Sequence, residues 1–503
     1  MFAHGGPDLP SKIVNHRIHI LLGPLIALVV VLFLLKLSAL DMKVVFMIGV
    51  TIWMAWWWMT EVVPVAVTSM LPMLLLPVLG ISPAKQTGMQ YMDSILFLYI
   101  GGFIIAFALE KWNLHKRVAF KILSIAGTKP SRILLGVMFT SYFISMWISN
   151  TATVMMLLAA VLALIAEVDA HYTDPVRKRN LAAALLIGLA YGASIGGIAT
   201  LVGTPTNMVF YRQYLASFPD AHDMDFFEWA KVGVPVSVFL LVIAFQAIRW
   251  MFFRKFNDSV VEAGYFRVKL NELGAWSREE RRVAIVFVLT VLLWFTRGDI
   301  DFGSMKIPGW NHLFVGYETF IDDGTIAVLA AIILFLLPAS DGKSKLMTWS
   351  DAKKLPFEII LLFGGGFALA HGFEASGLST MMAGSVAALN VHPILIVLLV
   401  VTMICIISEF ASNVATIQLM IPLLISGFSG SSINPLFILV PATLAASLGF
   451  MMPIATPPNT IVYGTKFIHT KELAREGLVV NIAGILAITL LSYILFAAGY
   501  YTK

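Results

Sequence analysis

Long apolar runs follow one another along almost the whole chain, from Ile18 to its last residues. About eleven of these runs are close to the ~20 residues that a helix needs to cross a hydrocarbon core of roughly 30 Å. They are predicted as transmembrane helices at 18–38, 44–60, 62–81, 94–112, 181–202, 232–252, 283–297, 324–339, 356–373, 436–452 and 477–499. The pattern therefore predicts an all-α polytopic membrane protein, not a soluble domain with one anchor.

Two further apolar regions, 132–166 and 393–427, are interrupted near the centre by a polar pair. The first pair is Ser149-Asn150 and the second is Ser412-Asn413. If either region crossed the bilayer completely, its polar centre would leave backbone groups without hydrogen bonds in lipid. Each region is therefore predicted as a re-entrant helical hairpin with the Ser-Asn pair at its tip.

The pattern also repeats. Each hairpin is followed by a second polar stretch, Gly203–Asn207 after the first and Ala455–Asn459 after the second. The glycine pair of the fourth span, Gly101-Gly102, resembles the glycines of the ninth, and an offset of five spans means that the copies are inverted. The predicted regions are an N-terminal segment with the first span at 1–43, a first repeat at 44–252, a cytoplasmic linker at 253–281 and a second, inverted repeat at 282–503.

Composition and charge fit this topology. The chain of 503 residues is 59% hydrophobic and 13% charged. If the N-terminus is cytoplasmic, 26 of the 34 Lys and Arg residues fall in cytoplasmic segments and 8 outside, as the positive-inside rule requires. We therefore expect a protein of the plasma (bacterial inner) membrane, surrounded by lipid, with its C-terminus outside. The net charge of +5 is explained by basic cytoplasmic loops, so we expect no nucleic-acid partner. The first hairpin then opens from the cytoplasm and the second from outside.

The hairpin tips and the two polar stretches carry the candidate chemistry. A helix that ends inside a protein offers free carbonyl groups to a cation, and a helix that begins there offers free amides to an anion. The side chains present are hydroxyls and amides, and such oxygen ligands suit a hard cation such as sodium better than a transition metal. No Lys or Arg lies in either hairpin interior or polar stretch, so a bound anion would depend on helix N-termini, amide donors and bound cations.

Other interpretations stay open at this point. Glu409 lies inside the second hairpin, where it could orient neighbouring groups by hydrogen bonding or relay protons. An ion channel would need a continuous selectivity pore, and an intramembrane enzyme would need a nucleophile with its base. The sequence favours a transporter over both because it shows paired polar sites and neither of those constellations.

At these residues the chain resembles the divalent anion/sodium symporter family, the INDY-type carboxylate transporters. The resemblance runs from about residue 44 to the C-terminus. It rests on these motifs: Thr60-Glu61 with the segment from Trp58 to Pro64, Ser149-Asn150-Thr151, Gly203-Thr204-Pro205-Thr206-Asn207, Ser412-Asn413-Val414, and Pro453 to Asn459.

This resemblance implies a homodimer whose transport domains move by an elevator mechanism. It implies one sodium site formed by Ser145, Ser149, Asn150 and Gly203, and a second formed by Ser408, Ala411, Asn413 and Ala455. It places the substrate carboxylates at Asn150, Thr151, Ser412 and Asn413, with Val414, Thr206 and Pro458 near by. Many members have Thr at the position of Val414 and Pro at that of Thr206, and both differences lie on the substrate side.

We therefore expect a sodium-coupled symporter, not an enzyme, that imports di- or tricarboxylates such as succinate, malate, fumarate or citrate. A sodium-independent dicarboxylate exchanger of the same fold and a sulfate/sodium symporter are the alternatives. The intact set of oxygen ligands favours symport over the exchanger.

Overall fold

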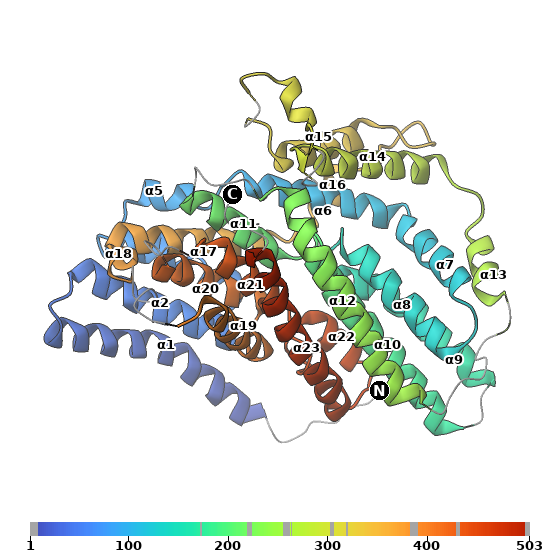
Figure 1. Cartoon of the computed structure of the whole chain (residues 1–503), viewed down its shortest axis with the longest axis horizontal. Coiled ribbons are helices and arrows are strands. Elements are labelled where there is room, and N and C mark those ends of the chain that lie inside the picture. The colour runs from blue at the N-terminus through green and yellow to red at the C-terminus, as the bar shows by residue number, and fades with distance from the viewer. Residues whose placement is uncertain are drawn as a thin grey trace.

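The computed structural model describes residues 9–171, 174–218, 224–254, 262, 264–301, 306–317, 320–382, 391–428 and 433–497 (Figure 1). The ends of the predicted first and last regions, at 1–8 and 498–503, therefore lie outside the described residues, as do 255–261 and 263 of the predicted linker. The described chain is almost entirely helical, which confirms the predicted all-α class.

The helices, in chain order, are α1 (Leu9–Leu37), α2 (Met42–Thr60), α3 (Val65–Thr68), α4 (Leu71–Val78), α5 (Ala84–Met89), α6 (Ile95–Lys111), α7 (Leu114–Ala126), α8 (Pro130–Ser145), α9 (Asn150–His171), α10 (Pro175–Ile198), α11 (Pro205–Ser217), α12 (Phe226–Phe253), α13 (Tyr265–Glu272), α14 (Arg278–Phe295), α15 (Asp323–Leu336), α16 (Trp349–Ala352), α17 (Phe357–Ser376), α18 (Leu378–Met382), α19 (Pro393–Phe410), α20 (Asn413–Phe428), α21 (Leu436–Ala446), α22 (Pro457–Tyr463) and α23 (Thr470–Ala497). A short 3-10 helix covers Trp310–Leu313. A small antiparallel ribbon joins β1 (Ile300–Asp301) to β2 (Lys306–Ile307), with Ile300 opposite Ile307.

Within the described residues, eight helices are long and apolar enough to cross a membrane, or nine if the bent pair α6 and α7 counts as one span. The number differs from the predicted eleven for two reasons. Among the eight are α9 and α19, which are limbs of the predicted hairpins. Conversely, some predicted spans are short helices, such as α15 with 14 residues and α21 with 11. Length alone therefore does not decide the number of spans, and eleven stays a prediction.

Both predicted hairpin regions are helix pairs that break at the Ser-Asn pair. Helix α8 ends at Ser145 and α9 begins at Asn150, while α19 ends at Phe410 and α20 begins at Asn413. The limbs of the first pair run beyond the predicted 132–166 at both ends. Helix α10 packs along α8 and α9, and α21 packs in the same way along α19 and α20. The two regions thus share one local architecture.

Helix α10 forms the centre of the packing around the first helix pair. Every residue from Leu181 to Ile198 is buried, because the helix is apolar on all sides. Glycines four residues apart let α8 approach closely: a β-carbon on Gly192 would lie 2.1 Å from Ser141 Oγ, and one on Gly196 would lie 2.2 Å from Tyr142 O. Small residues at this spacing allow helix backbones to meet in membrane proteins.

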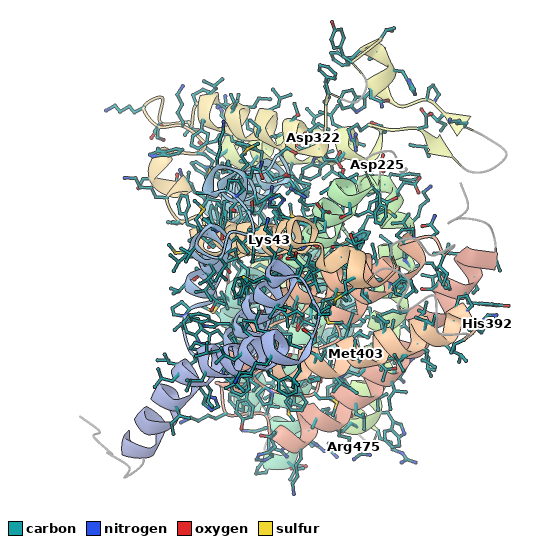
Figure 2. All side chains as sticks on the ribbon, turned by 90° about the vertical axis from the view of Figure 1, so that its left-hand side faces the viewer. Lys43, Asp225, Asp322, His392, Met403 and Arg475 are labelled. Carbon is teal, nitrogen blue, oxygen red and sulfur yellow. The ribbon has the colours of Figure 1, made fainter. Side chains whose placement is uncertain are left out.

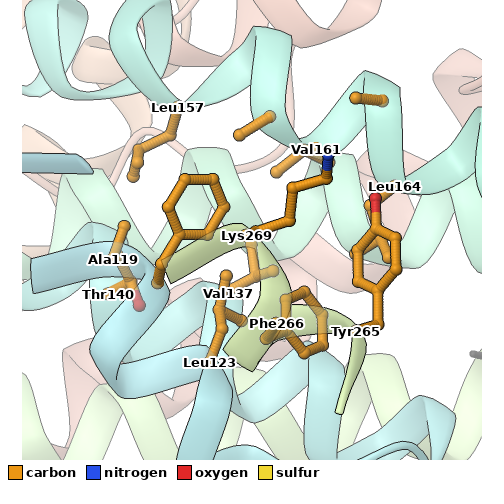
Figure 3. A pocket seen from close by; sticks show the side chains of 13 residues that line it. Ala119, Leu123, Val137, Thr140, Leu157, Val161, Leu164, Tyr265, Phe266 and Lys269 are labelled. Carbon is orange, nitrogen blue, oxygen red and sulfur yellow. The ribbon is translucent and has the colours of Figure 1, made fainter. Parts of the chain in front are cut away.

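The predicted linker is more than a polar connection. Its helix α13 packs against α7 and places Phe266 in the interior, with only 5% of the residue exposed. Figure 3 shows Tyr265 and Phe266 of α13 beside Leu123, Val137 and other apolar side chains of α7, α8 and α9. The linker therefore covers one side of the first hairpin.

A buried ion pair fixes the corner between α14 and α15. Arg297 Nε donates to Asp323 Oδ1 at 2.6 Å, and both residues are at least 95% buried. Trp294 Nε1 donates to the backbone oxygen of Asp323 at 3.0 Å. Because a buried charge is costly without its partner, this pair is sensitive to the loss of either side chain.

We expect Asp323→Ala to lower the free energy of unfolding by about 3–5 kcal/mol, since it leaves the Arg297 charge buried without its carboxylate. Unfolding of the purified protein in detergent with added denaturant measures the change. The neighbouring Asp322→Ala removes an exposed helix cap and serves as the control, at a cost of about 1 kcal/mol. Equal effects of the two substitutions would contradict the importance of the buried pair.

Candidate functional site

Two broken helices face the hairpins. The first break separates α10, which ends at Ile198, from α11, which begins at Pro205; the second separates α21 from α22, which begins at Pro457. Thr204 and Thr456 precede the prolines in extended conformation. Proline suits the first position of a helix because it lacks the amide hydrogen that this position cannot use. The sequence thus restarts each helix at the polar stretch.

One asparagine braces each break. Asn207 Nδ2 donates to the carbonyl oxygens of Gly197, at 3.1 Å, and Thr200, at 2.8 Å, which lie ten and seven residues before it. Asn459 Nδ2 likewise donates to the carbonyl oxygens of Gly449, at 3.1 Å, and Met452, at 3.2 Å, which also lie ten and seven residues before it. Both asparagines are fully buried. The same side chain therefore satisfies the carbonyls that the helix ends release in both halves of the chain.

The first hairpin tip meets the first break. Ser145 Oγ donates to Asn150 Oδ1 at 2.7 Å, and Ser149 Oγ accepts from a backbone amide in the first turn of α9 at 3.3 Å. A β-carbon on Gly197 would lie 2.4 Å from Asn150 Oδ1, and one on Gly203 would lie 2.6 Å from Gly197 O. The four residues predicted for the first sodium site therefore lie around Gly197.

The second tip meets the second break around Gly449. A β-carbon there would lie 3.3 Å from each of Asn413 Oδ1, Ser408 O and Ala455 Cβ. Three of the four residues predicted for the second sodium site are thus neighbours. For the fourth, Ala411, the described contact is the bond from its amide to the carbonyl oxygen of Ile407 at 3.0 Å, within its own hairpin.

The donor atoms at the second tip suit a sodium ion. Ser408 Oγ and Asn413 Oδ1 are buried and have no hydrogen-bond partner among the described residues. Buried polar atoms normally have partners, so these two unpaired oxygens of one hairpin tip are available to a ligand. No group of three or more His, Cys, Asp or Glu residues that could hold a metal ion occurs in the described part of the chain. Hydroxyl, amide and carbonyl oxygens are ligands for hard cations.

The predicted substrate residues Thr206 and Pro458 follow the two breaks. Thr206 is fully buried, and its Oγ1 lies 3.3 Å from the hydroxyl of Ser447, at the end of α21. This contact joins the two halves of the chain. Pro458 is also buried. Helix α20 packs on α11 and α22 packs on α9, so each hairpin contacts the other half's restarted helix.

The tip residues predicted to contact substrate differ in exposure. Thr151 is exposed at the start of α9, whereas Ser412, Asn413 and Val414 are half-buried. Val414 packs against apolar side chains. Among the described residues, no hydrogen bond connects Thr151 with Ser412. The structure therefore brings the residues predicted to bind sodium closer together than the residues predicted to bind substrate.

Glu409 organises the second break. Its carboxylate accepts hydrogen bonds from the amides of Phe450, Met451 and Met452 at 2.9 to 3.1 Å, and from Asn481 Nδ2. Only 4% of Glu409 is exposed. Amide donors of this kind stabilise a buried carboxylate and offset its desolvation. The geometry therefore favours the orienting role considered for this residue over proton relay.

The first break is held by neutral groups instead. Thr200 Oγ1 donates to the backbone oxygen of Met146 in the first hairpin, and Trp229 Nε1 donates to that of Ile198 at 3.1 Å. The two halves thus fasten each hairpin to its break by different side chains. Among the described residues, no carboxylate of the first half takes part in these two hydrogen bonds.

Sequence reasoning assigned no role to Gly197, Gly449 or Ser447, although they lie at the tips and between the halves. An alignment of the two polar stretches by their asparagines contains the signal for the glycines, because both lie ten residues before the asparagine. Ser447 has no such signal. The role of Ser447 is seen only in the folded structure, where its hydroxyl lies beside that of Thr206 from the other half.

A helical membrane protein with two hairpins that face two broken helices belongs to the class of membrane transporters. Solved transporter structures share this fold: YdaH of Alcanivorax borkumensis has a TM-score of 0.53 at 14% identity and covers 86% of this chain and 90% of its own. MtrF of Neisseria gonorrhoeae has a TM-score of 0.56 at 14% identity and covers 83% of each chain.

The chain belongs to the family defined by the sodium:sulfate symporter transmembrane region, whose model matches residues 15–497. Its relatives include the sodium-dependent dicarboxylate transporter SdcS of Staphylococcus saprophyticus, 37% identical over 98% of this chain and 94% of the relative. SdcS of Staphylococcus aureus strain NCTC 8325 is 37% identical over 95% of this chain and 90% of the relative. The resemblance noted from the motifs is thereby confirmed.

We expect Glu409→Gln to lower the free energy of unfolding by about 2–4 kcal/mol, because the new amide group places a donor among the three backbone donors. Thermal unfolding of the purified variant measures this loss. Glu374→Gln makes the same chemical change at an exposed position of α17 and should leave stability within about 0.5 kcal/mol of the parent. A Glu409→Gln protein as stable as the parent would contradict the orienting role.

Proposed function

We propose that the protein is a sodium-coupled symporter that imports dicarboxylates such as succinate, malate and fumarate, with the tricarboxylate citrate as a further substrate. The relatives that share 37% of its sequence over nearly the whole chain are named as sodium-dependent dicarboxylate transporters. The observation that carries the proposal is the pair of tips, each with an asparagine oxygen set against a glycine of a broken helix.

The sodium sites are proposed between tip and break. One ion is held by Ser145, Ser149, Asn150 and Gly203, and the other by Ser408, Ala411, Asn413 and Ala455. The unpaired Ser408 Oγ and Asn413 Oδ1 support the second site, and the contact of Asn150 Oδ1 with Gly197 supports the first. A β-carbon at Gly197 would clash with Asn150 Oδ1 at 2.4 Å, and one at Gly449 would be tight against Asn413 Oδ1 at 3.3 Å.

The carboxylates are proposed to bind at Asn150, Thr151, Ser412 and Asn413, beside Thr206, Val414 and Pro458. The two asparagines are the first residues of α9 and α20, where free backbone amides and the helix dipole favour an anion. No Lys or Arg lies in these segments. Bound sodium must therefore supply positive charge, since an uncompensated anion is costly in a medium of low dielectric constant. Coupling follows from this requirement.

Two inverted repeats, 44–252 and 282–503, are proposed to form the site. The asparagine braces at 207 and 459 support this, since they have the same spacing to their acceptors. Helices α12 and α23 occupy corresponding places after the breaks, and Figure 2 places Asp225, before α12, and Arg475, in the first turns of α23, at opposite ends of the molecule. An inverted relation allows one half to open inward and the other outward.

Succinate uptake into proteoliposomes should require an inward sodium gradient, and Asn150→Ala or Asn413→Ala should lower it about tenfold or more, the effect of losing a ligand to a charged group. Radiolabelled succinate, with sulfate and citrate as competitors, measures rate and selectivity. Gln86→Ala, an exposed amide on α5, is the matched control.

Three results of this assay have distinct meanings. Uptake that continues without sodium when the vesicles contain dicarboxylate would replace symport by exchange. Sulfate uptake with no competition from succinate would favour the sulfate symporter that the family model's description names. Full activity of Asn413→Ala would contradict the assignment of the second tip.

We propose further that the hairpins and broken helices move as one unit past α6 and α17, as in an elevator, within a homodimer in the bacterial plasma membrane whose N-terminus is cytoplasmic and whose C-terminus is outside. An ion pair is among the contacts that cross the proposed boundary. Arg212 on α11 pairs with Asp93, before α6, at 2.8 Å, and its guanidinium lies 4.8 Å from the ring centre of Phe367 on α17. Sliding would have to break this contact.

Cross-linking tests the movement. We expect Asp93→Cys with Arg212→Cys, joined by a short bifunctional reagent, to lose transport and to regain it when the linkage is cleaved. Cys405, the single native cysteine, is buried and can be replaced by Ala. Arg179→Cys with Glu472→Cys joins an ion pair between α10 and α23. Helix α23 packs on the hairpin limb α19, so we assign it to the moving unit, and this cross-linked protein should retain transport. Transport by the cross-linked 93–212 protein would contradict the elevator.

A further inference from the structure

Helix α7 leaves the direction of the apolar helix before it. The two helices are bent by 67° at a short break, and Asn113 at the corner has a left-handed φ of 55°. Lys116, Lys121 and the 76% exposed Ile125 lie on the outer surface of α7. An amphipathic helix at a steep angle to a neighbouring span lies along a membrane surface, with cations toward the lipid headgroups.

Arg117 fastens this helix to the start of α14. Its Nε and one of its terminal nitrogens donate to the carboxylate of Glu280 at 3.0 Å. The remaining bonds go to the carbonyl oxygens of Leu273, Gly274 and Ala275, at 3.0 to 3.3 Å. The charge of Arg117 is thus neutralised by Glu280, and the guanidinium serves to hold two elements together.

Two adjoining cavities lie beside this fastening. The outer one, the basic mouth, has a volume of about 680 Å³, and Lys121, Ile122 and Asn271 are part of its lining. The inner one, the apolar chamber, has a volume of about 230 Å³ and is lined on one side by Phe143 and on the other by Val288. Val118 and Trp276 line both cavities, so the chamber continues from the mouth.

The charge around the mouth is positive. Among the described residues, the Lys121 ammonium group has no hydrogen-bond or ion-pair partner. The carboxylates of α13 and α14 are already engaged: Glu272 with Lys269, Glu279 with the amide of Ser340, and Glu280 with Arg117. An anion at the mouth would therefore meet an available cation without displacing an acidic neighbour.

We propose that this pair of cavities binds an anionic phospholipid, with the phosphate of its headgroup at Lys121 and one acyl chain in the apolar chamber. The lining changes from basic to apolar along the path, as the chemistry of such a lipid changes from headgroup to chain. Trp276 lies at the transition and is 45% exposed, a position that tryptophan favours at a membrane interface.

The surroundings favour a lipid over a soluble anion. Val288 is 52% exposed and Phe143 is 37% exposed, so the chamber adjoins the surface that a membrane protein turns toward lipid. A soluble phosphate would use Lys121 and leave the chamber unfilled. The inner end of the chamber is formed by Ile144, Trp147 and Ile148, next to the first hairpin tip. A bound chain would thus brace the limb α8 against α14.

Native mass spectrometry of the purified full-length protein tests the binding, with dioleoylphosphatidylglycerol and dioleoylphosphatidylcholine as probes. We expect tighter binding of phosphatidylglycerol, and a loss of about fivefold in its affinity for Lys121→Gln, the factor that one lysine near an anionic headgroup supplies. Lys85→Gln, an exposed lysine on α5, which packs on α4 and α17 and not on α7 or α14, is the control and should bind like the parent. Ala284→Trp, which fills the chamber, should weaken both lipids.

Each contrary result overturns the proposal. Equal affinity for the two lipids would remove the anionic preference, and unchanged binding by Lys121→Gln would remove the assigned cation. Equal losses in Lys121→Gln and Lys85→Gln would indicate only general surface charge. Full competition by glycerophosphoglycerol, which has the headgroup without acyl chains, would show an anion site and no lipid site. Because Lys121 is exposed, its substitution leaves the packing intact and keeps the test independent of Ala284→Trp.

Discussion

Every polar backbone group inside a membrane protein needs a partner within the protein, and the architecture around the two broken helices answers this constraint. A transport site requires free carbonyl and hydroxyl oxygens where an unbroken helix would offer none. Asn207 and Asn459 resolve the conflict by donating to carbonyls that each break releases.

Close packing then sets the geometry where the hairpin tips meet the breaks. Gly197 and Gly449 each allow an asparagine oxygen of a hairpin tip to lie where a side chain would otherwise be. The glycines of α10 do the same for whole helices, since they bring α8 to backbone contact. In a membrane, where burial of apolar surface contributes little to helix association, such contacts supply much of the attraction. The same kind of close contact therefore holds the helices together and positions the asparagine oxygens.

The two halves satisfy the same constraint with different chemistry. Glu409 gathers three backbone amides at the second break, whereas Thr200 and Trp229 donate to carbonyls at the first. A carboxylate accepts hydrogen bonds from backbone amides, whereas a hydroxyl and an indole donate hydrogen bonds to backbone carbonyls. The second tip also has the unpaired oxygens of Ser408 and Asn413, so the two tips differ in their surroundings although both carry a Ser-Asn pair.

The sequence by itself determined the helical class, the two Ser-Asn tips, the prolines that restart the broken helices and the family, because these depend on local composition, on backbone preferences of proline and on motifs. Only the tertiary structure decided which atoms meet. Gly197, Gly449 and Ser447 gain their roles from segments tens or hundreds of residues away, and no local pattern records those distances. The helix α13 likewise looked like a polar linker until packing buried Phe266. The physical reason is that a contact depends on the relative placement of elements, which is set by the summed packing of the whole chain.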